Sequence, residues 1–283
     1  MTTAYYCMGG GLGHITRFAI FCRHFTLRPA LLTNCGLVRS GMIKPDAGPI
    51  MIPDEADSID LDSFRTWISN AIECCRPDTL IIDAFPGGIL GELCDLPALK
   101  GIKCIYLARI LDLSAYQSRL NGALPAFTKI YRIEQLGDEQ QNWLQTLQAP
   151  VEELTLPYNS RPVDEKSYHI ELPYNCWLIV HSGSIDELEQ LWQFACQTAE
   201  VEELSPNFAM VSPGKKPEFL PETVAHYNCY PADSLIEQAD RIFSAAGFNI
   251  MQQMKGRREK HLVMPMKRAL DDQFLRCRLA NQR

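Results

Sequence analysis

The chain has 283 residues, which is enough for two domains of ordinary size. Hydrophobic residues make up 46% of it and charged residues 22%, so the composition excludes a largely disordered protein. The formal net charge of −7 excludes a general nucleic-acid binder, because such a protein needs a basic face to neutralise phosphates.

Three further features bear on where the protein works. No apolar run reaches the roughly 18 residues that a membrane-spanning helix needs. The start, Met1-Thr2-Thr3, has no basic residues ahead of an apolar stretch, so we expect no signal peptide. The 11 cysteines are scattered and form no C-x-x-C pair. We therefore expect reduced, buried thiols and a cytoplasmic protein.

Short apolar segments alternate with helical patterns through the first half of the chain. This spacing predicts strands at 4–8, 30–33, 79–82 and 103–107, and helices at 15–25, 64–75 and 89–93. Residues 112–150 are less regular, apart from a polar helix near 138–147. Three prolines and many polar groups make 157–173 the expected linker.

The alternation resumes after the linker. We expect strands at 176–180, 207–211, 226–229, 241–243 and 262–264, and helices at 185–199, 233–238, 249–255 and 272–280. Strands separated by helices imply parallel sheets built from βαβ units. The predicted fold class is therefore α/β, with two Rossmann-like doubly wound domains, 1–160 and 161–283, facing a cleft. Ligands of such sheets bind beyond the carboxyl ends of the strands.

A glycine-rich loop, Gly-Gly-Gly-Leu-Gly-His at 9–14, lies between the first strand and the first helix. Backbone N–H groups at a helix N-terminus suit an anion, so Gly11 and Gly13 are candidate phosphate-binding residues. A Walker P-loop is excluded because no lysine precedes Thr16. A dinucleotide fingerprint lacks its third glycine and the acidic residue after the second strand. A tight turn whose glycines only allow close packing is the alternative.

Two side chains near this loop are candidate catalytic residues. His14 lies in the first turn of the helix, where the positive end of the dipole favours the neutral imidazole of a general base. The alternative is a histidine that caps its own loop. Asp83 ends the strand at 79–82 and is either an acceptor-binding or base-orienting carboxylate or the start of an Asx turn. Asp60-Leu61-Asp62 has a D-x-D pattern, but it precedes a helix and is predicted to cap it.

Two segments carry a resemblance to a known family. Residues 9–17 (GGGLGHITR) form the first, and 239–249 (ADRIFSAAGFN) form the second, which continues through 262–265 (LVMP) to 271–273 (DDQ). They resemble the GT-B glycosyltransferases, in particular the family of the lipid-linked N-acetylglucosaminyltransferase of peptidoglycan synthesis and related predicted UDP-sugar transferases. The resemblance covers both halves and is weak in the middle. It implies a nucleotide-sugar donor, most simply a UDP-sugar, with no cofactor and no metal.

The resemblance also implies donor contacts in the C-terminal half. The diphosphate would lie at the helix start formed by Ala246, Gly247, Phe248 and Asn249. The remaining implied contacts are Tyr230 to the base, Gln253 to the ribose, Asp272 and Gln273 to the donor sugar, and Ser182, Gly183 and Ser184 to phosphate. For the two serines, capping of the following helix is the alternative.

The sequence departs from the family pattern at three places. Gln253 stands where the family has a glutamate that holds the ribose, so this contact lacks the strength of a charged partner. Arg258-Glu259-Lys260 replaces the usual Gly-x-Pro, and the chain ends at Arg283, soon after 271–273. The basic run at 255–260 is predicted to be a solvated face that suits a helix C-terminus, with a peripheral contact to anionic lipid at the inner face of the membrane as the alternative.

The sequence therefore predicts a glycosyltransferase that inverts the anomeric carbon, with His14 as the base. The acceptor would be a sugar, a lipid-linked compound or a small molecule. One alternative is a hydrolase that frees the sugar from its nucleotide, as in nonulosonate synthesis. The other alternative is a non-catalytic protein that binds nucleotide sugars or serves as a scaffold.

Overall fold

The computed structural model describes residues 2–9, 11–55, 60–158 and 170–282. The chain divides into two compact units. Unit 1 comprises Met1–Pro157 and Arg268–Arg283, and unit 2 comprises Tyr158–Lys267. Most of the expected linker, 159–169, lies outside the described residues. Residues 268–283, which the sequence assigned to the second domain, pack in unit 1.

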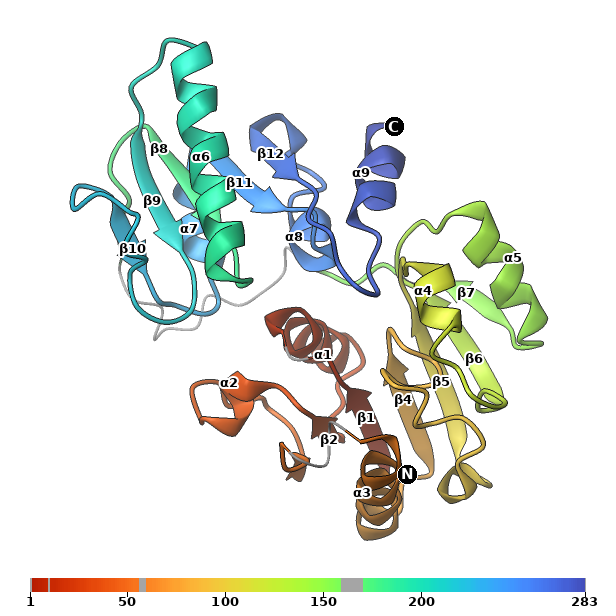
Figure 1. Ribbon diagram of the computed structural model, residues 1–283. Coiled ribbons are helices and arrows are strands. Elements are labelled where there is room, and N and C mark those ends of the chain that lie inside the picture. Colours follow the sequence, from red (N-terminus) through yellow and green to blue (C-terminus); the bar gives the residue numbers. More distant parts are fainter. Residues whose placement is uncertain (1, 10, 56–59, 159–169, 283) are drawn as a thin grey trace. The chain divides into compact units, whose positions relative to one another are not determined.

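Unit 1 is built on a seven-stranded parallel sheet with the order β3-β2-β1-β4-β5-β6-β7 (Figure 1). Its strands are β1 (Thr3–Cys7), β2 (Ala30–Thr33), β3 (Ile50–Met51), β4 (Thr79–Asp83), β5 (Lys103–Ala108), β6 (Phe127–Arg132) and β7 (Val151–Glu153). After β1 the chain first adds strands on one side, and then crosses over to add β4 on the other. The order reverses between β1 and β4, and such a switch point is where ligands of open α/β sheets bind.

Helices cover both faces of this sheet. Those in unit 1 are α1 (Leu12–His24), α2 (Gly36–Arg39), α3 (Leu61–Cys75), α4 (Leu113–Gln117), α5 (Asp138–Thr146) and α9 (Gln273–Asn281), with a 3₁₀ turn at Pro97–Leu99. Side chains of β1 alternate between the faces. Tyr6 packs in the core under α3, whereas the Tyr5 ring meets Phe18 of α1 with its centroid 5.0 Å away. Asp60 caps α3 by accepting the Ser63 N–H at 2.9 Å, which confirms the capping prediction.

The predicted helix at 89–93 is wrong. Gly88 and Gly91 both have φ of +88°, which breaks the helical backbone on either side. The buried Glu92 carboxylate accepts the N–H groups of Ile89 and Leu90 at 3.0 and 2.7 Å and also binds the Tyr6 hydroxyl. The segment is therefore a turn folded around one buried carboxylate. Strands β3, β6 and β7 were also missed in the sequence.

Unit 2 contains a five-stranded parallel sheet with the order β10-β9-β8-β11-β12. Its elements are β8 (Cys176–Val180), α6 (Ile185–Val201), β9 (Asn207–Val211), β10 (Ala225–Tyr227), α7 (Asp233–Gln238), β11 (Arg241–Ala245), α8 (Phe248–Gln253), a 3₁₀ turn at Arg258–Lys260 and β12 (His261–Met264). Trp177 and Ile179 pack against α6, whereas Leu178 faces α7. Together with unit 1, this confirms two doubly wound α/β domains.

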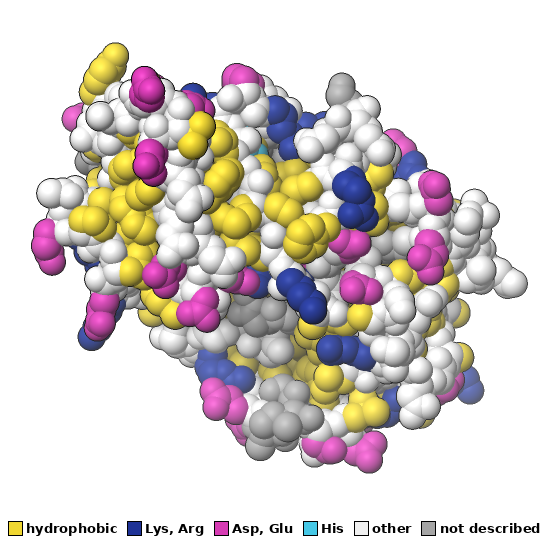
Figure 2. All heavy atoms as spheres, turned by 45° about the horizontal axis from the view of Figure 1, so that its top comes forward, with side chains coloured by type: hydrophobic (Ala, Val, Ile, Leu, Met, Phe, Trp, Pro, Cys, Tyr) yellow, Lys and Arg dark blue, Asp and Glu magenta, His cyan; other side chains and the backbone are white. Residues whose placement is uncertain are grey.

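The surface carries no dominant charged face in the view of Figure 2, where basic and acidic side chains are interspersed. All 11 cysteines are free thiols. Six of them are buried, whereas Cys74 is exposed, contrary to the expectation of buried thiols. None of the helices among the described residues has the length and apolarity needed to span a bilayer.

Candidate functional site

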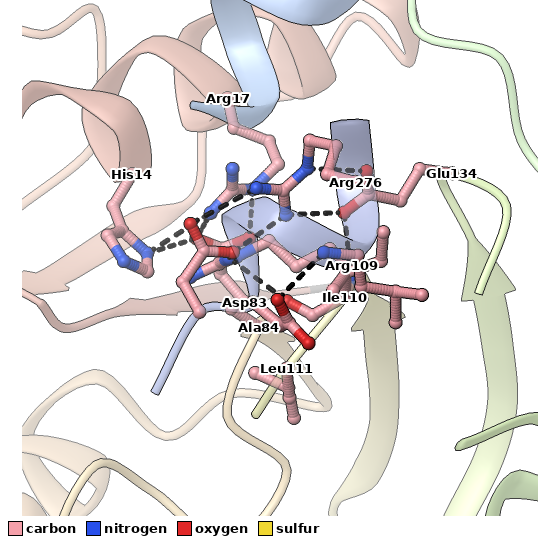
Figure 3. Close-up of polar contacts among 12 residues, drawn as sticks. His14, Arg17, Asp83, Ala84, Arg109, Ile110, Leu111, Glu134 and Arg276 are labelled. Atoms are coloured by element: carbon pink, nitrogen blue, oxygen red, sulfur yellow. Dashed lines mark hydrogen bonds and ion pairs between the residues drawn. The ribbon is translucent and has the colours of Figure 1, made fainter. Parts of the chain in front are cut away.

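The two predicted catalytic residues meet at the switch point of unit 1. His14 is the third residue of α1, directly after the glycine loop, and Asp83 is the last residue of the neighbouring strand β4. The Nδ1 of His14 lies 2.6 Å from Oδ2 of Asp83 (Figure 3). The parallel pairing of β1 with β4 explains the meeting, because the carboxyl ends of both strands lie at the same edge of the sheet.

Arg17 completes this cluster, and sequence reasoning missed it. Its Nε and Nη2 donate to the two oxygens of Asp83 at 2.5 and 2.7 Å, a side-on bidentate pair. All three side chains are buried. The positive charge of the Arg17 guanidinium balances the negative charge of the Asp83 carboxylate. Arg17 could have been predicted from the spacing, because it lies three residues after His14 and residues three apart on a helix share a face.

Burial and charge set the protonation of this cluster. Burial alone would raise the pKa of Asp83, but the Arg17 guanidinium and the His14 hydrogen bond outweigh it and hold that pKa well below its usual range. Burial lowers the pKa of His14 and outweighs the opposing effect of Asp83. A neutral His14 donates Nδ1–H to the ionised Asp83, which leaves Nε2 as the nitrogen with the lone pair.

The glycine loop makes room for the imidazole. Gly9 has a φ of +136°, and a Cβ there would overlap Nε2 of His14. The Gly9 N–H donates to the Asn34 side chain at 2.9 Å, which fixes the loop. Gly11 is the N-cap of α1 and Gly13 is its second residue, so both lie beside His14 as the sequence predicts. Whether they bind phosphate stays a prediction.

A second buried network lies at the same edge of the sheet and ties 268–283 to unit 1. Arg276 donates from Nε and Nη2 to the two oxygens of Glu134 at 2.8 and 2.9 Å. Asp271 accepts from Arg276 at 2.7 Å and from Arg109, which follows β5, at 2.5 Å. Arg109 and Glu134 are more than 130 residues from Asp271 and Arg276 in the chain, and no local pattern marks them as partners.

The predicted phosphate contacts at the start of α6 serve as a helix cap. Ser184 accepts the Glu187 N–H at 3.4 Å, and the Glu187 carboxylate accepts the Ser184 N–H at 3.3 Å, which makes a capping box. Glu187 also contacts Nε2 of His181 at 2.8 Å. Ser182 and Gly183 are exposed in the turn before the helix. A carboxylate at this helix start repels phosphate, so the geometry favours the capping alternative.

The predicted diphosphate-binding residues lie at the carboxyl edge of the sheet in unit 2. Ala246 and Gly247 form the turn after β11, and Phe248 and Asn249 begin α8. Tyr158 lies on this helix start, where its hydroxyl donates to the Asn249 side chain at 2.7 Å and its ring meets Phe248 edge-on. The turn after β11 is thus held by a residue from the other end of unit 2.

The last four predicted residues have unequal surroundings. Gln253 donates its amide to Asp233 at 3.0 Å, and Tyr230, after β10, is 37% exposed. Asp272 accepts the Leu275 N–H at 2.8 Å as the N-cap of α9, and Gln273 is buried. Residues 272 and 273 therefore lie in unit 1, while the other predicted donor residues after the glycine loop lie in unit 2.

The comparisons with known proteins decide the fold. No protein-family model and no curated protein sequence matches the chain, but solved structures do. The spinosyn forosaminyltransferase SpnP matches 100% of this chain with 83% of its own, at a TM-score of 0.60 and 14% identity. The glycosyltransferase SnogD from Streptomyces nogalater matches 95% of this chain with 82% of its own, at 0.59 and 16%. The chain has the GT-B fold.

Structures with this GT-B fold also include a UDP-N-acetylglucosamine 2-epimerase from Rickettsia bellii. It matches 96% of this chain with 80% of its own, at a TM-score of 0.57 and 11% identity. At identities this low the likeness establishes the fold.

One group of side chains in this GT-B protein has ligand atoms close enough for a metal ion. Atoms of Cys7, His14 and Asp83 all lie within 4.8 Å of one another. The Arg17 guanidinium already binds both oxygens of Asp83, and burial raises the pKa of the Cys7 thiol well above its ordinary value. The Nδ1–H of His14 is also donated to Asp83. The set therefore offers a cation an engaged carboxylate, an engaged imidazole nitrogen and a protonated thiol, and it does not fit a metal site.

The basic run at 255–260 is engaged within unit 2 of the GT-B fold. Lys260 donates to the backbone oxygens of Ile236 and Ala239 at 3.1 and 2.8 Å, at the C-terminal end of α7. Arg257 pairs with Glu237 at 3.3 Å. Cations suit a helix C-terminus, so these contacts favour an internal role over a contact with lipid.

Proposed function

We propose that this GT-B protein is a glycosyltransferase that moves a sugar from a UDP-sugar to an acceptor hydroxyl with inversion. The observation that carries the proposal is the buried arrangement of His14, Asp83 and Arg17 at the switch point of unit 1. It orients a neutral imidazole and keeps its partner carboxylate ionised, which is how an active site holds a general base.

In the proposed reaction, Nε2 of His14 takes the proton of the acceptor hydroxyl. The acceptor oxygen attacks the anomeric carbon from the face opposite the nucleoside diphosphate, whose bond to that carbon breaks with the electron pair. Inversion follows from this single displacement. The imidazolium that forms is stabilised by Asp83, and Arg17 keeps that carboxylate from taking the proton.

Unit 2 is proposed to bind the nucleotide. Its sheet also reverses order, between β8 and β11, and the turn formed by Ala246, Gly247 and Asn249 follows β11 at that point. Tyr230 and Gln253 lie on the segments after β10 and β11. Two of the matching structures support UDP as the nucleotide, since their names specify a UDP-N-acetylglucosamine 2-epimerase and a complex of MnaA with UDP.

The second candidate is a hydrolase in which water replaces the acceptor and His14 activates it. The epimerases among the matching structures favour it, because their names describe a reaction of a UDP-sugar rather than transfer to an acceptor. Release of nucleoside diphosphate in the absence of any acceptor would identify this activity. A non-catalytic binding protein would bind the nucleotide and release nothing.

The test is a turnover assay of nucleoside diphosphate release from UDP-, GDP- and TDP-sugars, with and without a panel of sugar and lipid-linked acceptors. We expect His14→Ala to lower kcat by about 100-fold or more, the usual contribution of a general base. His24→Ala is the matched control, because His24 is an exposed residue of the same helix. Equal rates in the wild type and His14→Ala would contradict the assignment of the base.

The pH profile of the same assay is a second readout. Because burial lowers the pKa of His14, kcat/KM should persist below the ordinary histidine pKa of about 6.5 and fall only at lower pH. The folded-state pKa values of His14 and Asp83 are both lowered. Their contribution to stability is therefore present above their ordinary pKa values and is lost as the pH falls.

A further inference from the structure

Three buried arginines lie at the carboxyl edge of the sheet in unit 1, and two of them bind a carboxylate in the same way. A guanidinium holds a carboxylate side-on through Nε and Nη2. Arg17 uses this edge for Asp83, at 2.5 and 2.7 Å. Arg276 uses it for Glu134, at 2.8 and 2.9 Å. The side chains of both pairs are at most 4% exposed, and Figure 3 shows their contacts as dashed lines.

Arg109 is the third arginine, and its side-on edge is unmatched. Its Nη1 donates to Asp271 at 2.5 Å and to the Ile110 carbonyl at 3.3 Å. Among the residues that the structure describes, no acceptor reaches its Nε, which is buried, and Nη2 makes no hydrogen bond. The residue is only 6% exposed. Asp271 thus fixes the guanidinium from one side and leaves Nε and Nη2 without a hydrogen-bond acceptor among the described residues.

A buried guanidinium edge without an acceptor is costly. A buried charged N–H that makes no hydrogen bond has lost its water without compensation, and such groups in native proteins call for a partner. A second ion pair, between Arg276 and Asp271, holds the carboxylate that orients Arg109.

Arg109 lies near the candidate base, His14. Arg109 follows β5, the strand next to β4, which ends at Asp83. The guanidinium carbon lies 5.6 Å from the centre of the Phe85 ring, and the His14 ring lies 5.6 Å from the same ring. One aromatic side chain therefore contacts both the cation and the imidazole.

We propose that the Nε–Nη2 edge of Arg109 binds a carboxylate or phosphate group carried by the acceptor. This deepens the proposed function and rests on it: the acceptor is a hydroxyl compound with an oxyanion, held so that its hydroxyl meets Nε2 of His14. Asp271 is then a positioning residue, which sets the plane of the guanidinium without touching the acceptor.

The test is a proton–nitrogen NMR titration of the arginine Nε–H signals of the full chain. The probes are inorganic phosphate and glycolate, which carries both a carboxylate and a hydroxyl. We expect a saturable shift of the Arg109 signal with both probes and none with chloride or glucose. Arg109→Lys, which keeps a cation against Asp271 but lacks the bidentate edge, should weaken binding of the probes by about tenfold. Arg28→Lys is the control, because Arg28 is an exposed arginine whose partner is Asp46.

An Arg109 signal that does not move with either probe would overturn the proposal, as would equal binding by Arg109→Lys. If that variant fails to fold, the wild-type titration still decides, because the proximity of Phe85 assigns the signal through contacts with its ring protons. UDP titration of the same sample separates the two claims. A shift without binding of UDP, GDP or TDP leaves the anion site standing and refutes the transferase, whereas nucleotide-sugar turnover without a shift does the reverse.

Discussion

At the scale of single residues, the contact between His14 and Asp83 joins two candidates that the sequence indicates separately. The end of a strand located Asp83, and the first turn of a helix located His14, so both could be predicted from alternation alone. Arg17 was within reach, because it lies one helical turn from His14. Arg109 and Asp271 were not, since 162 positions separate them and only the folded chain brings them together.

Replacement of Asp83 tests whether this cluster is held by charge. Asp83→Asn should lower the free energy of unfolding by about 3 kcal/mol, because it leaves the buried Arg17 guanidinium without its counter-charge. Urea denaturation measures the change. Asp46→Asn is the control, since that carboxylate pairs with Arg28 at an exposed site and its loss should have no measurable effect. Equal free energies of unfolding for the wild type and Asp83→Asn would show that the Asp83–Arg17 ion pair makes no net contribution to stability.

At the scale of elements, backbone conformation explains both the successes and the failure at the sheet edge. The glycine loop before α1 was predicted correctly because its composition is strongly biased. The helix expected at 89–93 fails because apolar spacing does not register a buried carboxylate. Glu92 takes the N–H groups that a helix would use, between two glycines with positive φ. A side chain that binds backbone N–H groups in this way produces no hydrophobic periodicity by which the sequence could reveal it.

Gly9→Ala tests the link between the loop and the imidazole. At a φ of +136° a side chain is strained, and its Cβ would overlap Nε2 of His14, so the imidazole must leave its present position against Asp83. We expect turnover to fall to the level of His14→Ala, with a lower melting temperature. Gly36→Ala serves as the comparison, since a Cβ at that helical position meets nothing within 4 Å. Full activity in Gly9→Ala would show that the loop does not position the base.

At the scale of the whole molecule, the alternation of strands and helices was enough to predict two doubly wound parallel sheets. The membership of 268–283 was not predictable. Its helix follows the last strand of unit 2 along the chain, yet Asp271 and Arg276 find their partners in Arg109 and Glu134 of unit 1. The sequence does not show which distant residues the charged side chains of this helix pair with.

The most direct test of the central claim is a thermal-shift titration of the full chain with UDP, GDP, TDP, their sugar conjugates and NAD. A ligand at free concentration c that binds only the folded state stabilises it by RT ln(1 + c/Kd), so the melting temperature rises with the logarithm of ligand concentration above Kd. We predict a rise with UDP and UDP-sugars, of equal size in the wild type and His14→Ala, because the base acts on the acceptor and not on the nucleotide. No rise with any nucleoside diphosphate, or a rise with NAD alone, would contradict the assignment of this fold to sugar transfer.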